Sequence, residues 1–365
     1  MISSRAARPS PAATGLRVLA ALVLLAVLAG LLPVLAAAPA SAGGEPTAAG
    51  RQAAPLRVMF VGDSITQGRT GDTTYRYWVW RALAQQSVPV RFVGPTTALR
   101  GGETYLRTDL GFQTAHAAAG GSGYADHLPL LRKRVRTHRP DVIVLGLGFN
   151  DARAHGAAQI LADARRYLRR AWRIDPRIRF VLNEVTTSAV TKAFTNNRRL
   201  EVDRGLRLLA AGDDRVQVAR IVSRGPRAWV PELHTYDGTH PTPTGETSIA
   251  HGVLRALQRL GLAPAAGRVF TRRDWDPALA AGDVAVAEDG REVTVSVPAW
   301  RTVSARELQV LALEGSGATV ATSAWTSGAR VAVRVPGPGD YTLRVVARRG
   351  TMTGVPGPAT PVLVG

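Results

Sequence analysis

The feature that most constrains the fold is a regular alternation of apolar runs with helical patterns between residues 56 and 260. Continuous apolar strands that alternate with helices predict a parallel sheet covered by helices on both faces. We therefore predict a three-layer α/β/α domain over residues 56–265 with about five strands. A Rossmann nucleotide-binding topology is the alternative, but no G-x-G-x-x-G follows a strand in the required context. Strands are expected at residues 56–61, 90–93, 141–147, 178–182 and 216–221, and helices at residues 74–86, 126–137, 157–174, 193–211 and 242–260.

The sequence pattern changes at Phe270. From there on, short runs of alternating apolar and polar residues are separated by turns rich in Gly and Pro. These runs predict a small all-β sandwich over residues 270–365. The order of Trp275, Trp300 and Tyr341 resembles that of a fibronectin type III-like module. Its role as a binding or spacing module, or as a structural cap, stays open at this point.

Residues 1–42 are expected to be a leader rather than part of the fold. Three arginines precede an apolar stretch over residues 18–38, and the sequence Ala-Ser-Ala that ends at Ala42 fits a signal-peptidase site. We predict a signal peptide cleaved after Ala42, a flexible linker over residues 43–55 and secretion, with no stable membrane span after cleavage. An uncleaved anchor is the alternative, because the apolar stretch is just long enough to span a bilayer.

Composition excludes some kinds of chemistry. The chain contains no Cys, so neither a thiol nucleophile nor a thiolate metal site can form. The net charge is +19, concentrated between the leader and residue 269. Such a basic domain can favour acidic partners, such as anionic cell-wall polymers, but Arg scattered through the segment as a compositional habit is the simpler explanation of the charge. No aromatic-rich motif accompanies the charge, so nucleic-acid binding is not predicted.

A serine stands where open α/β sheets bind their ligands. Gly62-Asp63-Ser64 follows the first apolar run directly, so Ser64 is expected at the carboxyl end of a strand and the start of a helix. Its hydroxyl would project into the crevice there, beside free backbone N–H groups that can receive a developing negative charge. Alone, the same residues equally make an ordinary turn and helix N-cap.

Three further segments bear on Ser64. Asp237 stands three residues before His240, a spacing that lets the carboxylate bind one ring nitrogen while the other nitrogen faces a hydroxyl. Asn150 follows the strongest predicted strand and can donate a hydrogen bond toward the same crevice. Gly123, in a glycine-rich turn before a predicted helix, allows close approach of its backbone N–H to a ligand.

Together these motifs resemble the SGNH, or GDSL, hydrolase family over roughly residues 56–260. The stretches 68–78 and 112–116 are similar to its secreted bacterial branch. The resemblance implies a flavodoxin-like fold and a triad of Ser64, His240 and Asp237. It also implies an oxyanion hole made by the N–H groups of Ser64 and Gly123 with the Asn150 side chain. The residues before Gly123 are unusually rich in Ala, so Gly121 could serve instead.

The resulting prediction is a secreted serine esterase that works through an acyl-enzyme, with no cofactor. The remaining histidines show no metal-ligand spacing, so no catalytic metal is expected. The substrate would be a small-molecule, lipid or acylated-glycan ester, with possible cell-wall or polysaccharide contact through the C-terminal domain. The alternatives are a non-catalytic cell-surface or polysaccharide-binding protein, and an acyltransferase or deacetylase acting on a glycan.

Overall fold

The computed structural model describes residues 54–223, 228–264 and 274–365. The predicted leader, most of the predicted linker and the predicted boundary between residues 265 and 270 lie outside these ranges. Within them, no helix combines the length and the hydropathy needed to cross a membrane.

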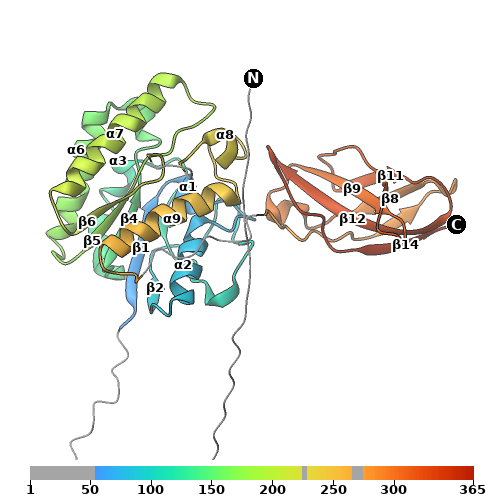
Figure 1. Ribbon diagram of the computed structural model, residues 1–365, viewed down its shortest axis with the longest axis horizontal. Helices are drawn as coiled ribbons and strands as arrows, with labels where there is room; N and C mark the ends of the chain where they lie inside the picture. Colours follow the sequence, from blue (N-terminus) through green and yellow to red (C-terminus); the bar gives the residue numbers. More distant parts are fainter. Residues whose placement is uncertain (1–53, 224–227, 265–273) are drawn as a thin grey trace, which may run out of the picture. The chain divides into compact units, whose positions relative to one another are not determined.

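A parallel sheet forms the centre of the first region, as predicted (Figure 1). Five strands lie in the order β2-β1-β4-β5-β6, and a sixth, two-residue strand, β3, pairs with the carboxyl end of β1. The register pairs Val58 of β1 with Val142 of β4, and Phe180 of β5 with Val216 of β6. The strands are β1 (Leu56–Gly62), β2 (Val90–Phe92), β3 (Ala117–Ala118), β4 (Val142–Gly146), β5 (Arg179–Asn183) and β6 (Val216–Ala219).

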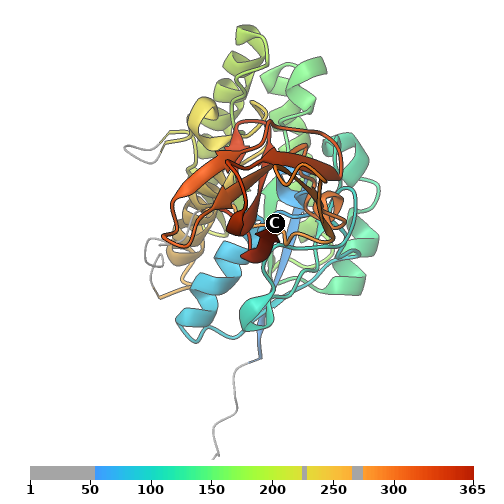
Figure 2. The ribbon, with the colours of Figure 1, turned by 90° about the vertical axis from the view of Figure 1, so that its right-hand side faces the viewer.

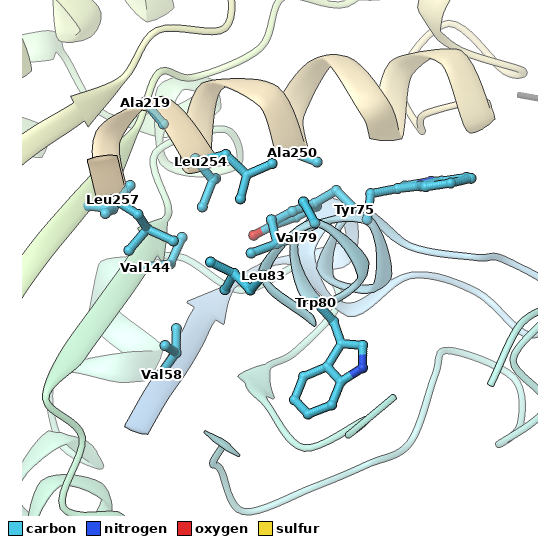
Figure 3. Packing of buried hydrophobic residues seen from close by; sticks show 14 of the residues in the cluster. Val58, Tyr75, Val79, Trp80, Leu83, Val144, Ala219, Ala250, Leu254 and Leu257 are labelled. Atoms are coloured by element: carbon cyan, nitrogen blue, oxygen red, sulfur yellow. The ribbon is translucent and has the colours of Figure 1, made fainter. Parts of the chain in front are cut away.

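Helices cover both faces of this sheet, which explains why its strands are continuously apolar. Helices α2 (Tyr75–Gln85) and α9 (Pro243–Arg259) pack on one face, and α6 (Ala157–Trp172) and α7 (Ala193–Ala211) pack on the other (Figure 1). On the first face, Val58 and Val144 from the strands meet Leu83 of α2 and Leu254 of α9 (Figure 3). All four side chains are fully buried. Burial of this kind contributes roughly 1.5–3 kcal/mol for each large aliphatic side chain.

The helices match the predicted pattern with one correction. The single helix expected at residues 126–137 is two helices, because Pro129 has no N–H to donate and disfavours helical geometry at the residue before it. Helix α9 begins as predicted, with the Thr242 side chain accepting a hydrogen bond from Gly245 N and with Pro243 in the first turn. The helices are α1 (Ser64–Gln67), α2 (Tyr75–Gln85), α3 (Tyr124–His127), α4 (Leu131–His138), α5 (Asp151–Ala154), α6 (Ala157–Trp172), α7 (Ala193–Ala211), α8 (Pro231–His234) and α9 (Pro243–Arg259), with a 3₁₀ turn at Asp109–Gly111.

The strand order decides where a ligand can bind. Chain direction across the sheet reverses at β1, whose neighbours β2 and β4 continue the chain to opposite sides. In doubly wound sheets the binding crevice opens at this switch point, outside the carboxyl ends of the strands. Ser64 directly follows β1 and Asn150 follows β4, so both lie at the switch point.

The C-terminal region is all β and antiparallel, as predicted. One sheet has the order β10-β9-β12-β13, with β14 also pairing with β12, and a second has the order β11-β8-β7. Figures 1 and 2 show the strands of this region in orange and red. Alternate residues of β8, β9 and β12 form the core between the sheets. The strands are β7 (Val284–Val286), β8 (Glu292–Ser296), β9 (Glu307–Leu313), β10 (Thr319–Thr322), β11 (Arg330–Arg334), β12 (Gly339–Arg349), β13 (Met352–Thr353) and β14 (Thr360–Val364), with a 3₁₀ turn at Trp300–Val303.

Candidate active site

Ser64, Asp237 and His240 come together although 176 residues separate the first from the last. The Ser64 hydroxyl lies 3.0 Å from Nε2 of His240, and Nδ1 of His240 lies 2.8 Å from Oδ2 of Asp237. Because a carboxylate can only accept, Nδ1 carries the proton and Nε2 accepts from Ser64. This is the tautomer in which an imidazole can take a proton from a serine hydroxyl.

The loop between α8 and α9 fixes the Asp237 carboxylate. Its Oδ1 accepts hydrogen bonds from the backbone N–H groups of Thr239 (3.0 Å) and His240 (2.8 Å). Gly238 turns the chain with φ +81°, a conformation that favours glycine. Burial opposes ionisation of Asp237, but the hydrogen bonds from the His240 ring and from the backbone outweigh it and lower its pKa. Asp237 is therefore held as a carboxylate facing the imidazole.

Asn150 lies beside the Ser64 turn, as predicted, and its amide points toward it. Its Nδ2 donates to the Ser122 carbonyl at 3.1 Å and approaches Oδ2 of Asp63 at 3.5 Å. Asp63 caps helix α1, because its Oδ1 accepts from Ile65 N at 2.9 Å. The structure thus links the turns after β1, β3 and β4 through one side chain.

The N–H of Gly123, the oxyanion donor expected from the family resemblance, is engaged within the protein. Its N–H donates to the Asp126 carboxylate at 2.8 Å, so it caps α3. Its missing side chain has a packing reason, since a Cβ there would overlap the Asp151 carboxylate. The alternative, Gly121, has φ +80° and open space where a Cβ would be.

Gly120 is the glycine that lies against Ser64. A Cβ on Gly120 would be 3.7 Å from Cβ of Ser64 and 3.3 Å from Oε1 of Gln67. The Gly120 N–H donates to that Gln67 oxygen at 2.8 Å. The sequence did not single out Gly120, because three glycines within four positions look alike until the chain path after β3 is known. No local pattern marked Gln67 as its partner.

The GDSL-like lipase/acylhydrolase family matches residues 60–247, a span that runs from β1 to the first turn of α9 and includes every residue of the site described above. The chain belongs to this family. A comparison with curated proteins gives no match.

Solved structures resemble a little over half of this chain. A carbohydrate esterase family 3 protein from Talaromyces cellulolyticus is 21% identical, with 56% of this chain and 98% of that chain covered and a TM-score of 0.48. A family 3 carbohydrate esterase from Clostridium thermocellum is 20% identical over 57% and 99% of the two chains, with a TM-score of 0.46. A GDSL-like lipase from Parabacteroides merdae is 16% identical over 57% and 97%, with a TM-score of 0.43.

Two buried histidines near this GDSL-like site are structural. Nδ1 of His116 accepts from Ala118 N, and its Nε2 donates to the Ala98 carbonyl, which shapes the chain around β3. Burial, reinforced by the neighbouring Arg76, lowers the pKa of His116 to about 2. Burial and then Arg134 lower the pKa of His127 to about 4. Both rings are therefore neutral at physiological pH.

The volume of a hollow in the surface would not by itself locate the candidate active site. A hollow of about 1070 Å³ is lined by arginines such as Arg132, Arg136 and Arg170, and none of the residues of the candidate site lines it. The space beside Ser64 and His240 measures only about 10 Å³. In the described part of the chain, no group of three or more His, Asp or Glu side chains is placed to hold a metal ion.

Asp63 should make stability depend on pH. Burial raises its pKa to about 7, against lowering contributions from the Ile65 N–H and His240. The folded state therefore keeps a proton that the unfolded chain releases near pH 4, so the free energy of unfolding falls as pH rises from about 4 to 7. Replacement Asp63→Asn keeps an oxygen for Ile65 N and should remove a slope of up to roughly 1.4 kcal/mol per pH unit. Urea unfolding at pH 5 and pH 7 measures this slope.

The matched control for that measurement is Asp213→Asn. A hydrogen bond from Arg215 is the main cause that lowers the pKa of Asp213, so its carboxyl is ionised throughout the range from pH 5 to 7. Its replacement should leave the slope as in the wild type. Equal slopes in the wild type and in Asp63→Asn would contradict the assignment to Asp63.

Proposed function

We propose that this protein is a serine esterase in which Ser64 is the nucleophile, His240 the general base and Asp237 the residue that orients the base. The observation that carries the proposal is the continuous hydrogen-bond chain from the Ser64 hydroxyl through His240 to Asp237. A serine hydroxyl is a weak nucleophile at its ordinary pKa, and an adjacent base that removes its proton activates it. Membership of a family of acylhydrolases supports ester cleavage as the reaction.

The reaction would proceed in two steps. The Ser64 Oγ attacks the ester carbonyl carbon while its proton passes to Nε2 of His240, and the alcohol leaves with that proton. The resulting acyl-Ser64 is then attacked by water, which gives its proton to Nε2 of His240. As the bond between the acyl carbon and Oγ breaks and the acid leaves, His240 returns this proton to Ser64. Asp237 stabilises the imidazolium formed in each step without taking its proton.

We infer that the oxyanion hole uses the N–H groups of Ser64 and Gly120 and the Asn150 amide. The Ser64 N–H begins α1 and, among the described residues, donates to no acceptor. The Gly120 N–H would exchange its present partner, Gln67, for the substrate oxygen. The Asn150 contact with Asp63, at 3.5 Å, is at the limit of a hydrogen bond and leaves that N–H available.

The narrow space beside Ser64 favours a short acyl group. Its lining includes Ile65, Tyr236 and Pro241, and its volume of about 10 Å³ is close to what a single water needs. An acetyl methyl group fits such a space, whereas a longer chain would have to displace buried side chains. With an aryl ester series, kcat/KM is expected to fall by roughly 10-fold or more from acetate to octanoate, since rearranging packed side chains costs about 1–3 kcal/mol. Equal rates along the series would overturn this acyl preference.

We further propose that the protein is exported and that its natural substrate is a small-molecule or glycan ester outside the cell. The support is the leader-like sequence of residues 1–42. Sequencing the N-terminus of the protein recovered from the culture medium is expected to begin at Gly43. An intact leader in a membrane fraction would favour the anchor instead.

A further inference from the structure

The turn between β12 and β13 of the C-terminal region reaches the loop that carries the base. The Thr351 N–H donates to the Tyr236 carbonyl at 2.9 Å, and its hydroxyl donates to the Thr235 carbonyl at 3.2 Å. Gly350 has φ +58°, and a Cβ on it would overlap the Tyr236 carbonyl oxygen. The backbone of this turn is therefore seated directly on the residue that precedes Asp237.

Arg349, the last residue of β12, is buried and paired with an acid from the nucleophile's side of the site. Its side chain is 3% exposed, and its guanidinium forms an ion pair with Asp72, which is 6% exposed. Oδ2 of Asp72 accepts from Arg69 N at 2.7 Å, so this acid orders the loop that follows α1. The guanidinium also lies over the Tyr236 ring, 4.4 Å from its centroid.

Tyr236 connects this arginine to the imidazole. Its ring stacks on the ring of His240, with centroids 6.0 Å apart and planes 22° apart. Its N–H donates to the His240 carbonyl at 3.0 Å. His240 is thus held at one ring nitrogen by Asp237 and on one face by Tyr236, and Tyr236 is in turn covered by Arg349.

Other contacts join the same two regions beside this network. The Trp275 indole N–H donates to the Gly71 carbonyl at 3.2 Å, and the Thr70 hydroxyl donates to the Thr302 carbonyl at 2.9 Å. A buried ion pair is costly to desolvate, and breaking it leaves an uncompensated charge in the interior. Arg349 and Asp72 therefore hold the contact in one arrangement rather than permitting loose association.

We propose that the C-terminal region is a positioning part of the esterase site, in which Arg349 and Gly350 hold Tyr236, and through it His240, at the distance from Ser64 that proton transfer requires. The proposal rests on the function proposed above. It assigns no contact with substrate to Arg349 or Gly350. It differs from a tethered binding module, whose loss would leave turnover of a small soluble ester unchanged.

The sharpest test is Gly350→Ala in the full chain. The added methyl group must push the turn away from Tyr236, so kcat for an aryl acetate is expected to fall about 10- to 100-fold, as displacement of a catalytic group by about 1 Å does. KM is expected to change less than kcat, because the atoms nearest to the added methyl group all belong to Tyr236, which is only one of several residues lining the space beside Ser64. Gly317→Ala is the matched control, since Gly317 also has positive φ (+80°) in a turn of the same region but has nothing within 4 Å of a Cβ.

A second pair of variants decides the matter if Gly350→Ala fails to fold. Arg349→Lys keeps a cation for Asp72, whereas Arg349→Met keeps only the length of the side chain, so kcat should fall in the order wild type, Lys, Met. Each rate is divided by the concentration of Ser64 that an organophosphonate labels, so that unfolded protein does not contribute to the enzyme concentration. Wild-type kcat in Gly350→Ala, or in Arg349→Met, would overturn the positioning role and leave the proposed esterase intact. Activity retained in Ser64→Ala would overturn the esterase itself.

Discussion

Replacing Ser64 by alanine is expected to lower kcat for an aryl acetate by about 10⁵- to 10⁶-fold, the scale seen when a serine nucleophile is removed from a triad. The variant lacks the oxygen that attacks the carbonyl carbon, and His240 then has no hydroxyl within its 3.0 Å reach to activate. Ser64 is only partly buried, so loss of one oxygen leaves packing nearly unchanged. Steady-state kinetics measure the loss, and urea unfolding checks that the fold is retained.

Covalent labelling makes this result specific to one residue. An organophosphonate ester should label the wild type once, with the label mapped to Ser64 by peptide mass analysis, and should not label Ser64→Ala. Ser316→Ala is a suitable control, because Ser316 lies in an exposed loop of the C-terminal region. A label on any other serine would show that the nucleophile has been misassigned.

The parts of the site that sequence reasoning found are those encoded locally. Ser64 and Asn150 each follow an apolar run, and in a parallel sheet all such positions meet at one edge. The spacing of Asp237 and His240 within one short loop likewise contains most of the information needed to orient the ring. These three segments could be combined because each is anchored to an element whose position the sheet topology determines.

The parts that sequence reasoning missed depend on the path of the chain between elements. Gly120 and Gly123 are equivalent in composition, and only the turn after β3 places the first against Ser64 and the second against Asp151. The pairing of Arg349 with Asp72 joins residues 277 positions apart, and no local pattern distinguishes this buried arginine from the less buried Arg344 and Arg348 of the same strand. The role of the C-terminal region was left open for that reason.

Replacing Asp237 by asparagine is expected to lower kcat by about 10⁴-fold with little change in KM, as a wrong tautomer of the base does in related triads. Both oxygens of Asp237 act as acceptors, Oδ2 for the His240 ring and Oδ1 for two backbone N–H groups. An amide has one oxygen only. If its NH₂ faces the ring, Nδ1 must accept and Nε2 carries the proton, so Nε2 can no longer take the proton of Ser64. If the NH₂ faces the backbone instead, it lies against the N–H groups of Thr239 and His240. These two N–H groups then have no acceptor, and the loop loses the hydrogen bonds that hold it.

A control variant, Asp213→Asn, separates the effect of the wrong His240 tautomer from the effect of weakening a turn. Asp213 is built alike, because its Oδ1 accepts from the backbone N–H two residues ahead, but it faces Arg215 instead of an imidazole. Asp213→Asn should therefore keep wild-type kcat. Steady-state kinetics at pH 7 compare the two variants. Activity within about tenfold of the wild type in Asp237→Asn would be far from the loss expected for a misoriented base. Another group would then have to orient His240. Tyr236, which stacks on the His240 ring and lies beneath Arg349, would be the first candidate.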